Sequence, residues 1–80
     1  MADVQILMPQ LGNEIEEAQI DAWLKQPGDP VEKNEQVVVV TTPKVTLEIE
    51  APEAGTLKAI LVEADEIAPV GAVLGVIETR

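Results

Sequence analysis

Few side chains in this 80-residue sequence can do chemistry, and the lysine amines are the main candidates. Cys, His, Ser and Tyr are all missing, which excludes disulfides, cysteine nucleophiles, Ser-His triads, histidine bases and nearly every zinc site. Carboxylates, five threonines, one arginine and four lysines remain. We therefore do not expect an enzyme with catalytic residues of its own.

Lys44 stands at a bend between two β-branched runs in the stretch 37–50, and a lysine at a turn is by itself usually only a solvated charge. Pro43 presets φ for position i+1 of a type I or II turn, so Thr42, Pro43, Lys44 and Val45 form the predicted turn with Lys44 at i+2. Its side chain is then expected to point outward. The other three lysines are expected within or beside strands, without a tight protruding turn: Lys25, Lys33 and Lys58.

The register of this hairpin supports the turn. On one face Val40 lies opposite Leu47 and Val38 lies opposite Ile49, so that face is apolar on both strands. The other face carries Val39 and Thr41 against Glu48 and Thr46. Agreement between two strands in a single register favours a hairpin more strongly than β-propensity alone.

The rest of the chain also predicts strands. They are expected at Val4–Met8, Ile15–Lys25, Thr56–Val62 and Ala72–Ile77, with turns at Pro27–Pro30 and Ala51–Gly55 and a connector at Ala64–Gly71. Within the second strand, Ile20, Ala22 and Leu24 share a face. A helix from Asn13 to Lys25 is the alternative, because its glutamates suit a first helical turn.

An internal repeat organises these strands. A shift of 37 residues brings Ile20 onto Leu57 and Val40 onto Ile77, and the order of strand, turn, acidic connector and strand recurs. The repeat predicts two antiparallel sheets packed face to face around one core and related by a pseudo-two-fold axis. The Lys44 hairpin then has an equivalent corner near Thr79-Arg80, at the opposite pole.

Composition restricts the partners. The net charge of −10 disfavours nucleic acid, and the single aromatic residue, Trp23, is interpreted as a core plug rather than a stacking platform. The longest uncharged run, Ile67–Ile77, is far shorter than a membrane span. No targeting peptide is recognisable, so one domain over residues 1–80 is expected, either cytoplasmic or cut from a mature protein.

Four segments carry a resemblance to a known family. They are Ala22–Val31 (AWLKQPGDPV), Val40–Val45 (VTTPKV), Ala51–Leu57 (APEAGTL) and Pro69–Leu74 (PVGAVL). In order and spacing the chain resembles the lipoyl/biotinyl carrier domains, and most closely the lipoyl domains of dihydrolipoamide acyltransferases in 2-oxoacid dehydrogenase complexes. The resemblance implies a flattened β-barrel, or barrel-sandwich hybrid, of two four-stranded antiparallel sheets. It also implies lipoate in amide linkage to Lys44, with Thr42, Pro43 and Val45 as its turn neighbours.

The same resemblance implies a function and a set of partners. The domain would be a swinging-arm carrier that moves acyl groups on lipoyl-lysine between active sites. Its partners would be a lipoate ligase or lipoyl transferase, a 2-oxoacid decarboxylase, the acyltransferase core and dihydrolipoamide dehydrogenase. No nucleic acid or membrane partner is implied, and the isolated domain is expected to be a monomer, in the cytoplasm or, for a mature eukaryotic domain, in the mitochondrial matrix.

Two alternatives remain at this stage. Biotin carriers flank their lysine with methionines, Ala-Met-Lys-Met, whereas lipoyl tips usually contain Glu-Thr-Asp-Lys-Ala and this chain has Thr41-Thr42-Pro43-Lys44-Val45. The chain is thus predicted to carry lipoate, with a biotin carrier of a carboxylase or an unmodified interaction module as the alternatives. The glutamates after the lysine form a candidate electrostatic footprint for partner enzymes: Glu48, Glu50 and Glu53.

Overall fold

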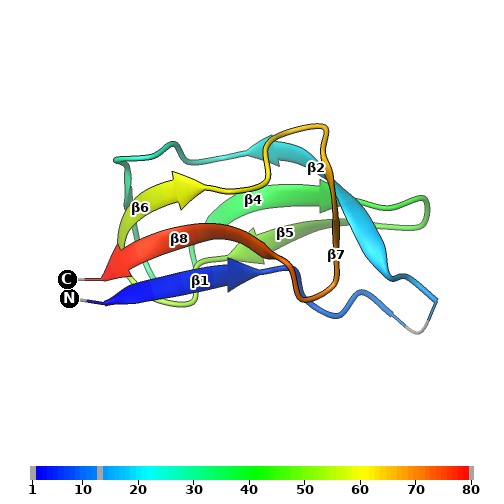
Figure 1. Cartoon of the computed structure of the whole chain (residues 1–80), viewed down its shortest axis with the longest axis horizontal. Helices are drawn as coiled ribbons and strands as arrows, with labels where there is room; N and C mark the ends of the chain where they lie inside the picture. The colour runs from blue at the N-terminus through cyan, green and yellow to red at the C-terminus, as the bar shows by residue number, and fades with distance from the viewer. Residues whose placement is uncertain (1, 13, 80) are drawn as a thin grey trace.

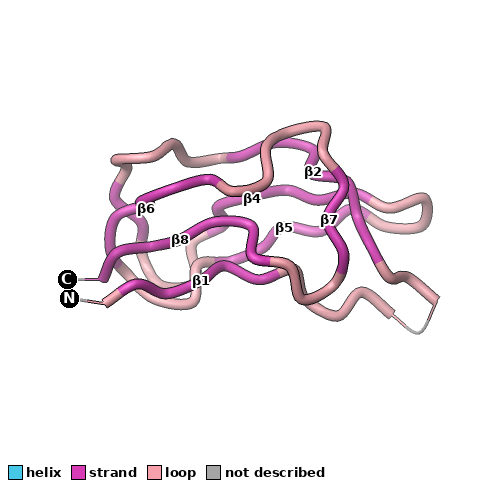
Figure 2. Tube along the Cα trace, viewed as in Figure 1, coloured by secondary structure: helices cyan, strands magenta, loops and turns pink. Residues whose placement is uncertain are grey.

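The computed structural model describes residues 2–12 and 14–79, and these residues form strands, turns and loops (Figure 2). The strands are β1 (Asp3–Leu7), β2 (Glu17–Trp23), β3 (Pro30–Val31), β4 (Gln36–Thr41), β5 (Thr46–Glu50), β6 (Gly55–Ile60), β7 (Ile67–Pro69) and β8 (Val73–Thr79). Within the described residues there is no helix long and apolar enough to cross a membrane.

The strands form two four-stranded antiparallel sheets. One has the order β1-β8-β6-β3 and the other the order β5-β4-β2-β7. They pack face to face into an elongated body of 37 × 20 × 18 Å, with the β4–β5 turn at one end and both chain ends at the other (Figure 1). The predicted flattened barrel and the opposite placement of hairpin and termini are both confirmed.

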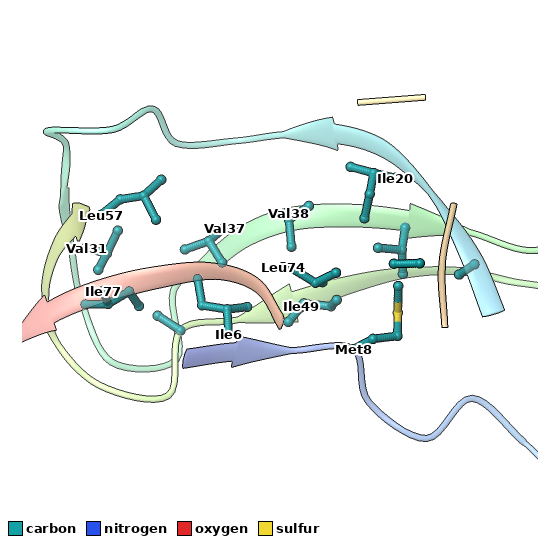
Figure 3. Packing of buried hydrophobic residues seen from close by; sticks show 14 residues of the cluster. Ile6, Met8, Ile20, Val31, Val37, Val38, Ile49, Leu57, Leu74 and Ile77 are labelled. Carbon is teal, nitrogen blue, oxygen red and sulfur yellow. The ribbon is translucent and has the colours of Figure 1, made fainter. Parts of the chain in front are cut away.

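One apolar core lies between the sheets, where side chains from β1, β2, β4, β5, β6 and β8 meet (Figure 3). Its largest fully buried side chains are Ile6, Met8, Ile20, Leu57, Leu74, Ile77, Val31, Val37, Val38 and Val40. No polar or charged residue within the described chain is buried. The hydrophobic effect of these side chains, each contributing about 1.5–3 kcal/mol when fully buried, therefore holds the sheets together.

The β4–β5 hairpin has the predicted register. Val40 pairs with Leu47 and Val38 with Ile49, while Val39 lies opposite Glu48. The bulge between Gln36 and Val38 departs from strict alternation, because it turns Val37 toward the core beside its neighbour Val38.

The pseudo-two-fold relation is confirmed residue by residue. Ile20 pairs with Val40 in one sheet, and Leu57 pairs with Ile77 at the equivalent place in the other. A bulge follows each of these pairs at once, on β2 and on β6. Because bulges set local twist and bending, the matching bulges show that the two halves share their curvature as well as their order of strands.

The strand predicted in this segment is confirmed as β2, so the helix alternative is wrong, and one detail of the predicted side-chain pattern is wrong as well. No helix occurs between Glu14 and Lys25, and Asn13 lies outside the described residues. The bulge after Ile20 reverses the side-chain alternation, so Trp23 packs against the core while Leu24 is 49% exposed. The predicted common face of Ile20, Ala22 and Leu24 is therefore incorrect, whereas the structural interpretation of Trp23 is confirmed.

Two short edge strands were missing from the predicted elements. Strand β7 lies within the segment expected to be a connector and pairs with β2, and β3 follows the Pro27–Pro30 turn and pairs with β6. Strands of two or three residues contain too little alternation to be recognised locally. Their neighbours in the sheet define them.

Gly55 provides a test of how closely β6 and β8 approach. A Cβ at this position would overlap the backbone carbonyl of Glu78, which cannot move without disturbing the ladder. We expect Gly55→Ala to destabilise the fold by about 1–3 kcal/mol, the usual cost of overpacking. Glu53→Ala is the control, because Glu53 is exposed in the turn just before Gly55 and surface substitutions usually change stability by no more than about 0.5 kcal/mol. Equal losses in urea unfolding would contradict the close approach.

Candidate modification site at the hairpin tip

Lys44 lies on the turn between β4 and β5, and its side chain is 67% exposed. The turn extends beyond the sheets at the end of the molecule farthest from the chain termini (Figure 1). The structure thus presents the Lys44 amine on a tip whose two supporting strands are both anchored in the core, as the sequence predicted.

The Thr42 hydroxyl closes the turn. It accepts hydrogen bonds from the backbone N–H groups of Lys44 (3.2 Å) and Val45 (2.9 Å), and it lies 3.0 Å from the Val45 carbonyl oxygen, to which the Thr42 N–H also donates at 2.8 Å. The predicted turn residues are correct, but the role of Thr42 was missed. Threonine before a turn can bond to the backbone that follows it, and that was the available signal.

The chain ends reproduce this arrangement at the other pole. The Thr79 N–H donates to the Ala2 carbonyl at 2.8 Å, and the Ala2 N–H donates to the Thr79 hydroxyl at 3.0 Å. Thr79 and Ala2 therefore correspond to Thr42 and Val45 under the pseudo-two-fold axis. Arg80 lies outside the described residues, so only the Thr79 part of the predicted corner is confirmed.

A segment from the β1–β2 loop lies beside the tip. The Glu14 carboxylate is 3.6 Å from the Lys44 amine, with 84% and 67% of the respective side chains exposed. Exposed ion pairs contribute little, at most about 1 kcal/mol, so this contact leaves the amine accessible. Shallow hollows on this side are lined by residues 12 and 14–17 together with Pro43 and Lys44.

Apolar side chains lie on the other side of the turn. Ile67 is 60% exposed on the edge strand β7 and, with Pro43 and Thr42, lines a shallow hollow next to the hairpin base. Val45, directly after the lysine, is 42% exposed. The surroundings of Lys44 are thus partly apolar in a chain that is otherwise strongly acidic.

Two of the other lysines are held in closer ion pairs. Lys25 is 2.7 Å from Glu35 and Lys58 is 3.0 Å from Asp3. Hydrogen bonding to these carboxylates raises the pKa of Lys25 and of Lys58 and lowers the pKa of Glu35. Both amines thus lie closer to a carboxylate than the Lys44 amine, which is 3.6 Å from Glu14.

Lys33 requires a correction. It lies in a tight turn, in which the Glu35 N–H donates to the Glu32 carbonyl at 3.0 Å, so the prediction that it lacks such a turn is wrong. This turn joins β3 and β4, which belong to different sheets, and β3 pairs with β6 near the chain termini. Lys33 is therefore a natural control for Lys44, being a turn lysine at the other pole.

The site offers an exposed primary amine with rigid support. Within residues 2–12 and 14–79 no group of three or more Asp, Glu, His or Cys side chains is placed to hold a metal ion. The chemistry available at the tip is acylation of the Lys44 amine by an activated carboxylic acid. Comparisons with known proteins point in the same direction.

The family model described as "Biotin-requiring enzyme", which covers biotin and lipoyl attachment domains, matches residues 4–77. The chain belongs to the biotin/lipoyl family. Members of this family hold a covalently attached biotin-type or lipoate cofactor, and the exposed amine at the tip suits either group.

Relatives within the biotin/lipoyl family include acyltransferase components. The chain is 42% identical over 72 residues to the dihydrolipoyllysine-residue acetyltransferase component of the acetoin cleaving system of Pseudomonas putida, covering 90% of this chain and 20% of that protein. It is 44% identical over 73 residues to the acetyltransferase component of the pyruvate dehydrogenase complex of Corynebacterium glutamicum, covering 91% and 11%. The chain thus spans a fifth or less of the length of these relatives.

Solved structures show the same fold. The lipoyl domain of the 2-oxoglutarate dehydrogenase complex from Azotobacter vinelandii superimposes with a TM-score of 0.76 at 27% identity, covering 96% of this chain and 99% of that domain. The urea carboxylase of Kluyveromyces lactis matches with a TM-score of 0.82 over 98% of this chain and 6% of that protein, but at 17% identity it indicates the fold alone.

We expect Thr42→Val to loosen the tip while leaving the sheets intact. Valine keeps the shape of the side chain but removes the oxygen that accepts from Lys44 and Val45, a loss of about 1–2 kcal/mol. Amide hydrogen exchange at those two residues should accelerate. Thr46→Val is the matched control, because the Thr46 hydroxyl bonds only to that of Thr41, at 3.2 Å on the exposed face. Unchanged exchange in Thr42→Val would contradict the role of the hydroxyl.

Proposed function

We propose that this chain is a lipoyl carrier domain in which Lys44 holds lipoate through an amide to its ε-amino group. The bound lipoate supplies a dithiolane that accepts and releases acyl groups. The domain carries the arm between the active sites of a 2-oxoacid dehydrogenase complex and has no catalytic residues of its own. The observation that carries the proposal is the position of Lys44 on the protruding turn of a hairpin in a biotin/lipoyl fold.

The residues around Lys44 have separate tasks in this proposal. Thr42 fixes the backbone of the turn through its hydroxyl, and Pro43 restricts φ just before the lysine. Val38 and Val40 of β4 and Ile49 of β5 are buried, so both strands that carry the turn are anchored in the core. A ligase or partner enzyme therefore finds the amine, or the arm attached to it, at a fixed position.

Lipoate is favoured over biotin by the relatives and by the turn itself. The acyltransferase relatives are named for a dihydrolipoyllysine residue, and the solved neighbour at 27% identity is a lipoyl domain. The residues on either side of Lys44 are Pro43 and Val45, neither of which is the methionine that flanks the lysine in biotin carriers.

The relatives support partners from acyltransferase complexes, and the proposed lipoyl arm also needs enzymes that attach, load and reoxidise it. The proposed partners are a lipoate ligase or lipoyl transferase, a 2-oxoacid decarboxylase, an acyltransferase core and dihydrolipoamide dehydrogenase. The net charge of −10 suits transient docking on basic enzyme surfaces, since complementary charge raises association rates without requiring high affinity.

Coexpression with a lipoate ligase tests the attachment point. Intact-mass measurement should show one lipoyl group on the wild-type chain and on Lys33→Ala, and none on Lys44→Ala. Lys33→Ala is the control because it removes the turn lysine at the opposite pole. A lipoyl group remaining on Lys44→Ala, or lost from Lys33→Ala, would refute the assignment.

Pro43→Asp tests the departure from the usual tip. Proline lowers the entropy of the unfolded hairpin, so the variant should be less stable by about 0.4–1 kcal/mol in thermal melting. Aspartate restores the acidic neighbour of lipoyl tips, and we expect faster acyl transfer to the lipoylated variant from the decarboxylase of a pyruvate dehydrogenase complex. Both proteins are compared fully lipoylated, so that ligase preference cannot affect the rates. Equal rates would show that this carboxylate has no part in partner choice.

A further inference from the structure

An open groove of about 520 Å³ lies between β1 and β5, which are the edge strands on one long side of the body (Figure 1). Residues from both strands line it, together with one proline after each strand: Gln5, Ile6, Leu7, Pro9, Leu47, Glu48, Ile49, Glu50 and Pro52. Its floor is apolar, and Leu7 is 47% exposed there.

The pseudo-two-fold axis makes the two sides of this groove comparable. Gln5 pairs with Val76 as Glu48 pairs with Val39, so Gln5 and Glu48 occupy equivalent positions. Leu7 and Glu50 are equivalent in the same way, two pairs further along. The backbone is therefore repeated on both sides, whereas among the lining residues acidic side chains occur only on β5, the strand that follows Lys44. No basic residue lines the groove.

The backbone of β5 offers hydrogen-bonding groups along this groove. The Thr42 N–H bonds to the Val45 carbonyl, and in an antiparallel ladder the bonded pairs alternate, which assigns Leu47 and Ile49 to the pairs bonded with β4. The N–H and C=O groups of Thr46 and Glu48 then point away from β4. In the described part of the chain β5 has no neighbour on that side, so an extended segment can add to it.

We propose that the groove between β1 and β5 is a docking site for an extended, basic segment of an enzyme that acts on the Lys44 arm, and this rests on the proposed carrier function. The segment pairs its backbone with β5, places apolar side chains over Leu7 and Leu47, and directs lysine or arginine side chains at Glu48 and Glu50.

The location suits such a contact. Glu48 is four residues beyond Lys44, about 13 Å along an extended strand. The start of β5 is therefore within reach of an enzyme surface that surrounds the attachment point of the arm. Of the glutamates predicted as a footprint, Glu48 and Glu50 line the groove and Glu53 does not.

The probe is a ten-residue synthetic peptide of alternating lysine and valine, titrated into the lipoylated domain and followed by amide NMR shifts. We expect millimolar binding, with the largest shifts in β5 and in residues 5–7, and weaker binding at higher salt. Glu48→Lys with Glu50→Lys should weaken binding at least tenfold. Asp21→Lys with Glu63→Lys is the matched control, since both side chains are exposed outside the groove and the charge changes equally; its affinity should stay within twofold.

A second pair of variants separates charge from backbone pairing. Glu48→Gln removes only the carboxylate. Glu48→Pro removes both the carboxylate and the backbone N–H that points away from β4. Proline is tolerated at this position of an edge strand, because the lost N–H takes no part in the hydrogen bonds with β4. Binding should fall further in Glu48→Pro. Equal weakening by the groove and control charge reversals, or shifts centred elsewhere, would overturn the proposal. Lipoylation of each variant, checked by intact mass, tests the carrier function separately, and the unmodified domain can be titrated if lipoylation fails.

Discussion

The structure depends on the burial of apolar side chains in the core between its two sheets. Strand β4 contributes Val37, Val38 and Val40, strand β8 contributes Leu74 and Ile77, and all five side chains are fully buried. With 80 residues and neither disulfides nor buried polar groups within the described chain, this apolar core is the main source of stability. The hairpin tip is anchored because Val40 of β4, just before the turn, is fully buried in the core.

The pseudo-two-fold symmetry helps to separate features that folding requires from features that serve a function. Where the two halves agree, as in the bulges after Ile20 and Leu57, folding is a sufficient explanation. The two poles also share their hydrogen bonds, at Thr42 and at Thr79. The halves differ in the lysine at one tip and in the acidic residues of β5. The symmetry of the fold does not explain these differences, and the proposed carrier function and docking site depend on them.

The four lysines differ in their local surroundings. Lys25 and Lys58 lie 2.7 and 3.0 Å from carboxylates, and hydrogen bonding to these carboxylates raises the pKa of both amines. Lys33, like Lys44, lies in a tight turn, but its turn is at the opposite pole. An enzyme that recognises a projecting hairpin can therefore distinguish Lys44 from the others by position, without an extended recognition sequence.

Local sequence was sufficient for the features that short-range physics controls. The Lys44 turn, the hairpin register and the all-β class follow from Pro43 and from side chains alternating at a period of two, and the 37-residue repeat predicted the symmetry. Tertiary structure decided the rest. The bulge after Ile20 turned Trp23 inward and Leu24 outward, because strand curvature is set by packing against the other sheet. Strands β3 and β7 exist only through pairing with β6 and β2. The groove between β1 and β5 joins residues some forty positions apart, and no local pattern contains such a contact, since it arises only when the two sheets close over the core.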